Sequence, residues 1–89
     1  MIGFFFYIVQ CSDGSYYIGH TDDLLKRINE HNAGVYPVYT SKRLPVKLVY
    51  YELFNTRDEA FAAEHKVKKW SRRKKEILIK EGWSGFLKK

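Results

Sequence analysis

Five side chains of this 89-residue chain are of the types that hydrolyse a phosphodiester bond when a fold brings them together. They are Tyr7, Tyr17, Arg27, His31 and Glu64. Phosphoryl transfer needs one group that offsets negative charge in the transition state and another that activates water. Arginine suits the first task, and tyrosine or histidine suits the second. We therefore predict that these five residues form one site for phosphodiester cleavage.

Glu64 is the most unusual of the five, because it falls on an apolar stripe. If residues 56–70 form a helix, Glu64 lies four residues after Ala60 and three before Val67. A carboxylate that faces a core is costly unless a positive group satisfies it. A single Mg²⁺ or Mn²⁺ ion is one such partner, and it would keep positions for water and phosphate oxygens. The ordinary alternative is a buried glutamate that pairs with Arg27 or a tyrosine hydroxyl.

Arg27 and His31 are four residues apart, so both project from the same side of a helix. A guanidinium there could clamp the scissile phosphate, while His31 could relay a proton or bind the phosphate. Tyr17 is our candidate for activating water, with Tyr7 as its hydrogen-bond partner or as an alternative base. A phenol is a weak base at neutral pH unless positive charge lowers its pKa from about 10. As isolated residues, all four would more commonly be packing or surface groups.

Further substrate contacts are expected near these residues. Gly19 ends a strand, where a small residue allows phosphate or a helix to approach closely. The basic candidates for phosphate contacts are His20, Lys42, Arg43, Lys69, Arg72 and Arg73.

The net charge of +6 is concentrated in one segment. Residues 66–75 contain seven basic side chains and no acid. A localised positive stripe favours a polyanionic partner, with nucleic acid ahead of an anionic membrane. A solvated helix face is the ordinary alternative for such a run.

The elements that must position these residues follow from patterning and turn signals. Three apolar segments predict strands, namely residues 4–10, 16–19 and 46–54. The first and third are apolar on both alternating sets, which suits strands covered on both faces. Capping residues and periodicity predict three helices, over residues 21–32, 56–70 and 72–80, with a loop over 35–45. The order β-β-α-β-α-α predicts a small α+β domain, a three-stranded antiparallel sheet flanked by helices.

Local signals sharpen this outline. Thr21 is the expected N-cap of the first helix, residues 56–59 form a capping box, and Gly82 stops the third helix. In the first hairpin, a three-residue loop with Gly14 in the left-handed conformation pairs Val9 with Tyr17. This register places Tyr7 and Tyr17 on one face as diagonal neighbours.

Composition excludes several other classes. Cys11 is the only cysteine, so an internal disulfide is excluded and a reducing compartment is favoured. The apolar run 2–9 is too short to span a bilayer, so we predict a cytoplasmic protein with no membrane contact. The cysteine and the histidines lack zinc-ligand spacing, and no glycine-rich phosphate loop is present.

The spaced set resembles the GIY-YIG nuclease superfamily. The resemblance covers about residues 4–80 and runs through Phe5-Phe6-Tyr7, Tyr17-Ile18-Gly19, Arg27, His31 and Glu64. The segments 31–34, 39–41 and 69–72 look most like small stand-alone members, although Phe5-Phe6 replaces the Gly-Ile of the first motif.

The resemblance implies one nuclease domain over residues 1–89. It implies a metal-dependent endonuclease acting on DNA, in repair or recombination, with Glu64 as the metal ligand. Target recognition could then come from a protein partner. Two alternatives remain open. One is a nucleic-acid-binding module without catalysis, and the other is an adaptor that recruits a protein through Trp70, Trp83 and Phe86.

Overall fold

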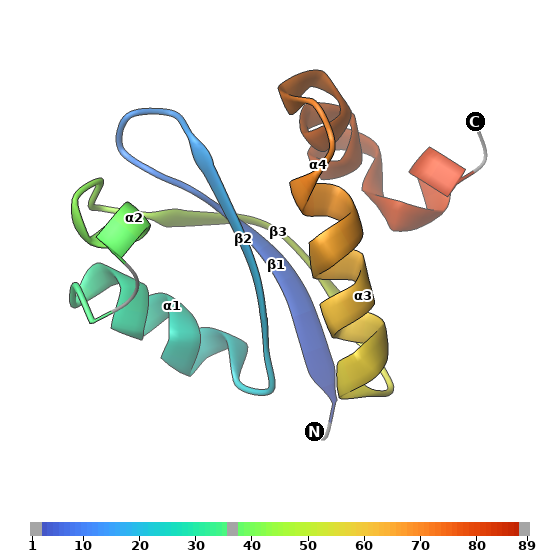
Figure 1. Cartoon of the computed structure of the whole chain (residues 1–89), viewed down its shortest axis with the longest axis horizontal. Helices are drawn as coiled ribbons and strands as arrows, with labels where there is room; N and C mark the ends of the chain where they lie inside the picture. Colours follow the sequence, from blue (N-terminus) through green and yellow to red (C-terminus); the bar gives the residue numbers. More distant parts are fainter. Residues whose placement is uncertain (1–2, 36–37, 88–89) are drawn as a thin grey trace.

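The computed structural model describes residues 3–35 and 38–87, with the backbone alone for residue 38 and residues 84–87. Figure 1 labels its helices and strands along the chain. They are β1 (Phe4–Gln10), β2 (Tyr16–Thr21), α1 (Leu24–Asn32), α2 (Val38–Ser41), β3 (Lys47–Phe54), α3 (Arg57–Lys68) and α4 (Arg72–Leu87). Apart from the four-residue α2, this is the predicted order β-β-α-β-α-α, so the α+β fold class is confirmed.

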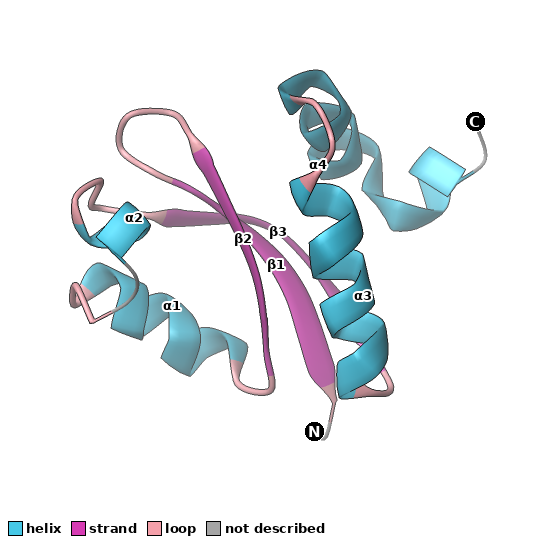
Figure 2. Ribbon diagram, viewed as in Figure 1, coloured by secondary structure: helices cyan, strands magenta, loops and turns pink. Residues whose placement is uncertain are grey.

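The three strands form one antiparallel sheet in the order β2-β1-β3, so β1 is the central strand. Its side chains enter two separate cores and are buried on both faces, as its pattern predicts. Phe6 and Ile8 pack against α3 and α4, while Tyr7 and Val9 pack towards α1. Figure 2 shows the helices divided between the two sides of the sheet in the same way.

β3 has the same apolar pattern as β1 but lies at the edge of the sheet. Tyr51 and Leu53 on this strand are 53% and 39% exposed, so the expectation of cover on both faces is wrong for β3. Composition alone does not show which of two apolar strands is central, because pairing partners decide it.

The hairpin register is confirmed. Val9 pairs with Tyr17, and the Cys11 N–H donates to the Ser15 carbonyl at 2.8 Å. Gly14 has φ of 88°, the left-handed conformation that the three-residue loop requires. Tyr7 and Tyr17 therefore share one face of the sheet.

Two predictions of local structure are wrong. Residues 35–45 contain α2, a helix too short for its pattern to show in the sequence. α1 begins later than predicted, because its N-cap is Asp23, which accepts the Lys26 N–H at 3.1 Å. The Thr21 hydroxyl instead accepts the Asp23 N–H at 3.1 Å and shapes the turn that leads into α1.

The later helices begin and break where the sequence predicts. Thr56 and Glu59 form the capping box of α3, which satisfies backbone N–H groups that the helix leaves open. Gly82, with φ of 79° and ψ of 170°, interrupts α4, and a further helical turn follows it.

The aromatic residues proposed for an adaptor surface are used mainly in folding. The Trp83 ring lies 6.0 Å from the Phe6 ring and 6.0 Å from the Phe54 ring. Trp70 stacks on Trp83 at 6.4 Å. The side chain of Phe86 lies outside the described residues. Both tryptophans are half-buried in these contacts, which weakens the adaptor alternative.

Candidate active site

The five predicted catalytic residues come from β1, β2, α1 and α3, and Figure 1 shows β2 between α1 and α3. Tyr7 comes from the central strand and Tyr17 from β2, while Glu64 comes from α3. Arg27 and His31 come from α1. The side chains of Arg27, Tyr17 and Glu64 all lie close enough to Tyr7 to act on its pKa. β2 is an edge strand, so this convergence lies at an open side of the sheet.

One part of the site is a buried hydrogen-bonded chain, which we call the buried cluster. Its members are Tyr7, His31 and Thr40, and all three are fully buried. The Tyr7 hydroxyl lies 2.9 Å from Nε2 of His31, and Nδ1 of His31 lies 3.0 Å from the Thr40 hydroxyl. Both ring nitrogens of His31 thus have partners inside the protein. His31 would have to leave them to contact a phosphate, so the arrangement suits a relay better.

Burial raises the pKa of Tyr7 to about 12, against the opposing effect of a hydrogen bond from Arg27. Tyr7 is therefore a neutral phenol at neutral pH. Since Arg27 can only donate, it leaves the Tyr7 hydroxyl hydrogen available for His31. The geometry permits a chain in which Arg27 donates to Tyr7, Tyr7 to His31, and His31 to Thr40.

Gly19 fits the site because the Tyr7 ring covers it. The register pairs Tyr7 directly with Gly19. A Cβ atom built on Gly19 would lie 2.6 Å from the Tyr7 hydroxyl oxygen and 2.8 Å from the ring carbon that carries it. The sequence predicted that phosphate or a helix would approach this glycine closely, whereas the group that does so is the ring of Tyr7.

The second part of the site is ionic, and we call it the charged cluster. Its members are His20, Glu64 and Lys68. Nδ1 of His20 lies 2.5 Å from Oε1 of Glu64, and Nζ of Lys68 lies 2.7 Å from Oε2. Glu64 is 9% exposed, as its place on the apolar stripe predicts. Among the residues that the structure describes, these partners differ from Arg27 or a tyrosine hydroxyl, which the ordinary alternative named.

Burial by itself would raise the pKa of the Glu64 carboxyl. Hydrogen bonds and charge from His20 and Lys68 outweigh burial and leave that pKa below its ordinary value. Glu64 is therefore ionised at neutral pH. An ionised carboxylate is the form that a hard divalent cation requires.

Arg27 lies between the two clusters. Its Nη1 donates to the backbone carbonyl of His20 at 3.3 Å, and its Nε lies 3.5 Å from the Glu30 carboxylate. Together with the bond to Tyr7, these contacts hold the guanidinium against β2. A fixed guanidinium suits recognition of a phosphate better than a mobile one.

Tyr17 borders a surface groove that adjoins the charged cluster. Its ring lies 5.3 Å from the His31 ring and 6.2 Å from the Tyr39 ring. The groove has a volume of about 220 Å³. Its lining residues are Tyr16, Tyr17, Ile18, Tyr39, Lys68 and Lys75. The groove thus joins a candidate base to a lysine that contacts Glu64.

Two of the predicted phosphate contacts brace the β1–β2 hairpin. Arg43 donates to the Asp13 carboxylate at 3.0 Å, with its guanidinium 4.0 Å from the centre of the Tyr39 ring. Arg72 donates to the Gly14 carbonyl at 3.0 Å. These arginines therefore already have protein partners.

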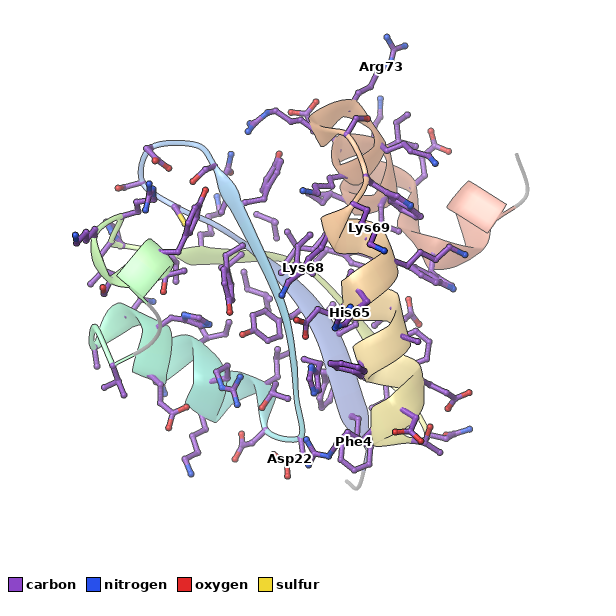
Figure 3. The ribbon with its side chains drawn as sticks, in the orientation of Figure 1. Phe4, Asp22, His65, Lys68, Lys69 and Arg73 are labelled. Carbon is purple, nitrogen blue, oxygen red and sulfur yellow. The ribbon has the colours of Figure 1, made fainter. Side chains whose placement is uncertain are left out.

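The other predicted contacts divide between the site and the surface. His20 lies in the site but binds Glu64. Lys42, Lys69 and Arg73 are exposed. In Figure 3, Arg73 points outward from the start of α4, and Lys69 stays over α3 without reaching β2. The structure therefore does not gather all seven predicted substrate contacts in one place.

Sequence reasoning missed two residues that complete the clusters. Lys68 follows Glu64 by four residues on one helix, so the spacing rule for helical ion pairs could have found it. Thr40 gave no comparable signal, because it reaches His31 from a segment predicted as a loop.

A metal at this site would have few ligands from the protein. Within the described residues, no group of three or more His, Cys, Asp or Glu side chains could hold a metal ion. The donor set fits only an ion that Glu64 holds alone and that takes its other oxygens from water and substrate. Across the same part of the chain, no helix has the length and apolar character needed to cross a membrane.

Comparison with known proteins defines the class of this chain. Residues 3–76 match the model of the GIY-YIG catalytic domain, a nuclease fold. The chain belongs to the GIY-YIG catalytic domain family, so the resemblance found in the sequence is confirmed.

Individual relatives span most of this chain. A UPF0213 protein of Haloquadratum walsbyi is 50% identical over 76 residues, which cover 85% of each chain. A UPF0213 protein of Listeria monocytogenes is 53% identical over 75 residues, covering 84% of this chain and 83% of the relative. The solution NMR structure of a protein from E. faecalis has a TM-score of 0.62 and 40% identity, covering 90% of this chain and 85% of that one.

Proposed function

We propose that this protein is an endonuclease that hydrolyses DNA phosphodiester bonds with one Mg²⁺ or Mn²⁺ ion, in DNA repair or recombination. The observation that carries the proposal is an ionised, largely buried Glu64 at the same strand edge as Arg27 and Tyr17. Membership of a nuclease family supports the reaction class. The preference for DNA and the repair role come from the family likeness.

Glu64 would hold the metal through one carboxylate. When bound, such an ion offsets charge on the phosphate and favours ionisation of a water molecule. The carboxylate already accepts hydrogen bonds from His20 and Lys68, so at least one of them must yield its place. Lys68 is the better candidate, because its side chain is 47% exposed.

Arg27 would bind the scissile phosphate and stabilise charge that develops in the transition state. Tyr17, in its ionised phenolate form, would take the proton from water and become a neutral phenol, because it borders the groove and Tyr7 does not. Tyr7 is fully buried and has a pKa of about 12, which suits positioning and proton relay through His31. The exposed basic side chains of residues 66–75 would attract the DNA backbone.

A single domain over residues 1–89, a cytoplasmic location and a partner that selects the target stay part of this proposal. The buried thiol of Cys11 agrees with a reducing compartment.

A non-catalytic nucleic-acid-binding module is the second candidate. One specific observation favours it, since both oxygens of Glu64 already accept hydrogen bonds from protein groups. Such a module would use the same groove and basic surface for binding alone.

Cleavage of a DNA panel separates the two candidates. Branched, nicked, flapped and plain duplex DNAs are incubated with the protein and Mg²⁺ or Mn²⁺, beside Glu64→Gln and a chelator control. The nuclease proposal expects metal-dependent cleavage that Glu64→Gln lacks. Salt-sensitive binding of the same DNAs without cleavage would contradict it and support the binding module.

A further inference from the structure

Lys68 belongs to two features of the molecule at once. Its ammonium group lies 2.7 Å from Oε2 of Glu64, and its side chain also lines the groove beside Tyr17 and Tyr39. In Figure 3, Lys68 extends from α3 towards β2, whereas the neighbouring Lys69 does not. A single lysine thus connects the candidate metal ligand with the groove that would receive the substrate.

An ammonium group and a divalent cation cannot share Oε2 of Glu64 without strong repulsion. Both need the same lone pairs, and two positive charges a few ångströms apart repel even near a protein surface. Lys68 is therefore a resident cation that competes with the metal. The other carboxylate oxygen stays with His20, so movement of Lys68 alone would open one metal position.

The groove offers Lys68 a second anionic partner once substrate is present. Lys75 lines the same groove, so a phosphate there would meet two ammonium groups. Lysine has a flexible stem and binds phosphate as a point charge, so a change of partner needs rotation of side-chain bonds alone. Because its side chain is half exposed, this rotation disturbs no core packing.

We propose that Lys68 guards Glu64: it neutralises the carboxylate in the free protein and moves to a substrate phosphate in the groove, which opens Glu64 to the metal. This role rests on the nuclease function proposed above and specifies how its site is regulated. Substrate binding and metal binding then strengthen each other, and by linkage the two effects are equal in size.

Lys68→Met keeps an unbranched side chain that is one atom shorter and removes its charge. Lys69→Met is the matched control, because it removes the same charge from an exposed position one residue away. Glu64→Gln removes the proposed ligand. Circular dichroism spectra and melting temperatures establish that each variant is folded.

The first readout is Mn²⁺ binding without nucleic acid. It is measured by the EPR signal of aqueous Mn²⁺, which an ion loses when it binds. Lys68→Met should bind Mn²⁺ roughly tenfold more tightly than the parent. Lys69→Met should change the affinity less than twofold, and Glu64→Gln should lose the site. Equal affinities for the two lysine variants would overturn the guarding role while leaving the nuclease proposal standing.

The second readout adds a phosphorothioate DNA oligonucleotide, which keeps its charge and resists hydrolysis. The oligonucleotide should tighten Mn²⁺ binding by the parent protein and have much less effect on Lys68→Met, in which Glu64 is already accessible. An equal increase in both proteins would overturn the proposed movement of Lys68. Because neither readout requires cleavage, failure of the parent to cut DNA would refute the nuclease proposal separately.

Discussion

The two clusters of the site lie on either side of β2 and differ in both charge and access to water. The buried cluster joins Tyr7, His31 and Thr40 through hydrogen bonds and is fully shielded from solvent. The charged cluster joins His20, Glu64 and Lys68, and its lysine is half exposed. Arg27 connects them, since it contacts Tyr7 on one side and the His20 carbonyl on the other.

This difference indicates two roles. The buried cluster holds side chains in position, and the charged cluster exchanges its ligands. Opening the buried cluster would leave polar groups without partners in an apolar core, so its geometry is held in place. The charged cluster can replace one cation by another, because its lysine reaches water. A site that must bind and release a metal and a phosphate needs both kinds of cluster.

The largest expected effect follows from removing the charge at the centre of the charged cluster. Glu64→Gln keeps the shape of the side chain but removes the metal ligand, so metal-dependent cleavage should be abolished. Its circular dichroism spectrum should stay that of the parent, so the loss of cleavage is not a loss of the fold. Asp58→Asn, an exposed change on the same helix, is the matched control and should cut normally. Undiminished cleavage by Glu64→Gln would end the assignment of this residue.

Removal of the residue that connects the clusters should come next in size. Arg27→Ala loses a preorganised positive charge, so its single-turnover cleavage rate should fall by about 10²–10³. Lys26→Ala removes the same charge from an exposed neighbouring position and should stay within a few-fold of the parent. DNA affinity should remain near normal for both, because the interaction is assigned to the transition state. A drop in affinity without a drop in rate would assign Arg27 to binding alone.

The sequence predicted the position of Glu64 and the register of the β1–β2 hairpin, but it did not predict Lys68 and Thr40, which complete the two clusters. Gly14 and the alternation of β1 determine the hairpin, and both are local signals. The position of Glu64 on an apolar stripe is equally local. Thr40 could not be predicted in this way, because its contact with His31 depends on how a connecting segment folds over α1. The same limit explains β3, whose edge position depends on strand pairing.

A crowding substitution tests whether the buried cluster is as rigid as its geometry indicates. Gly19→Ala places a methyl group 2.6 Å from the Tyr7 hydroxyl, so Tyr7 must shift. We expect a loss of stability towards the upper end of roughly 1–3 kcal/mol, measured by urea unfolding. Adding Tyr7→Phe removes the nearest atom, so the double variant should lose less than the sum of the single losses. Strict additivity would mean that the Tyr7 hydroxyl does not press on position 19, since the ring carbon 2.8 Å away is kept in Tyr7→Phe.

A second substitution in the buried cluster removes a hydrogen bond and keeps the packing, and its expected effect is smaller. Thr40→Val keeps the shape of the side chain and removes the oxygen next to Nδ1 of His31. The buried ring nitrogen then lacks that partner, so stability should fall by about 1 kcal/mol or more. Cleavage should also slow, and Thr40→Ser should restore both. Should Thr40→Val cut at the parental rate below its melting temperature, Thr40 would have no positioning role.

The smallest effect concerns the pH at which each cluster stops stabilising the fold. The charged cluster should lose its contribution at low pH and the buried cluster at high pH. The folded pKa of Glu64 lies below its unfolded value, so its contribution is present above that unfolded value and is lost as pH falls through the folded pKa. Tyr7 has a folded pKa of about 12 against an ordinary 10.0, so its contribution is complete below 10.0 and is lost as pH rises towards 12. Each proton changes stability by no more than about 1.4 kcal/mol per pH unit.

Urea unfolding at a series of pH values measures both losses of stability. We call the loss at low pH the acid limb and the loss at high pH the alkaline limb. Glu64→Gln should flatten the acid limb in part and leave the alkaline limb unchanged, because hydrogen bonds from Ser15 also lower the pKa of Asp13. Tyr7→Phe should instead act on the alkaline limb alone. Tyr7→Phe should flatten the alkaline limb only in part, because burial also raises the pKa of Tyr50. If either variant altered both limbs equally, the two clusters would be one coupled network, and the division between positioning and ligand exchange would not hold.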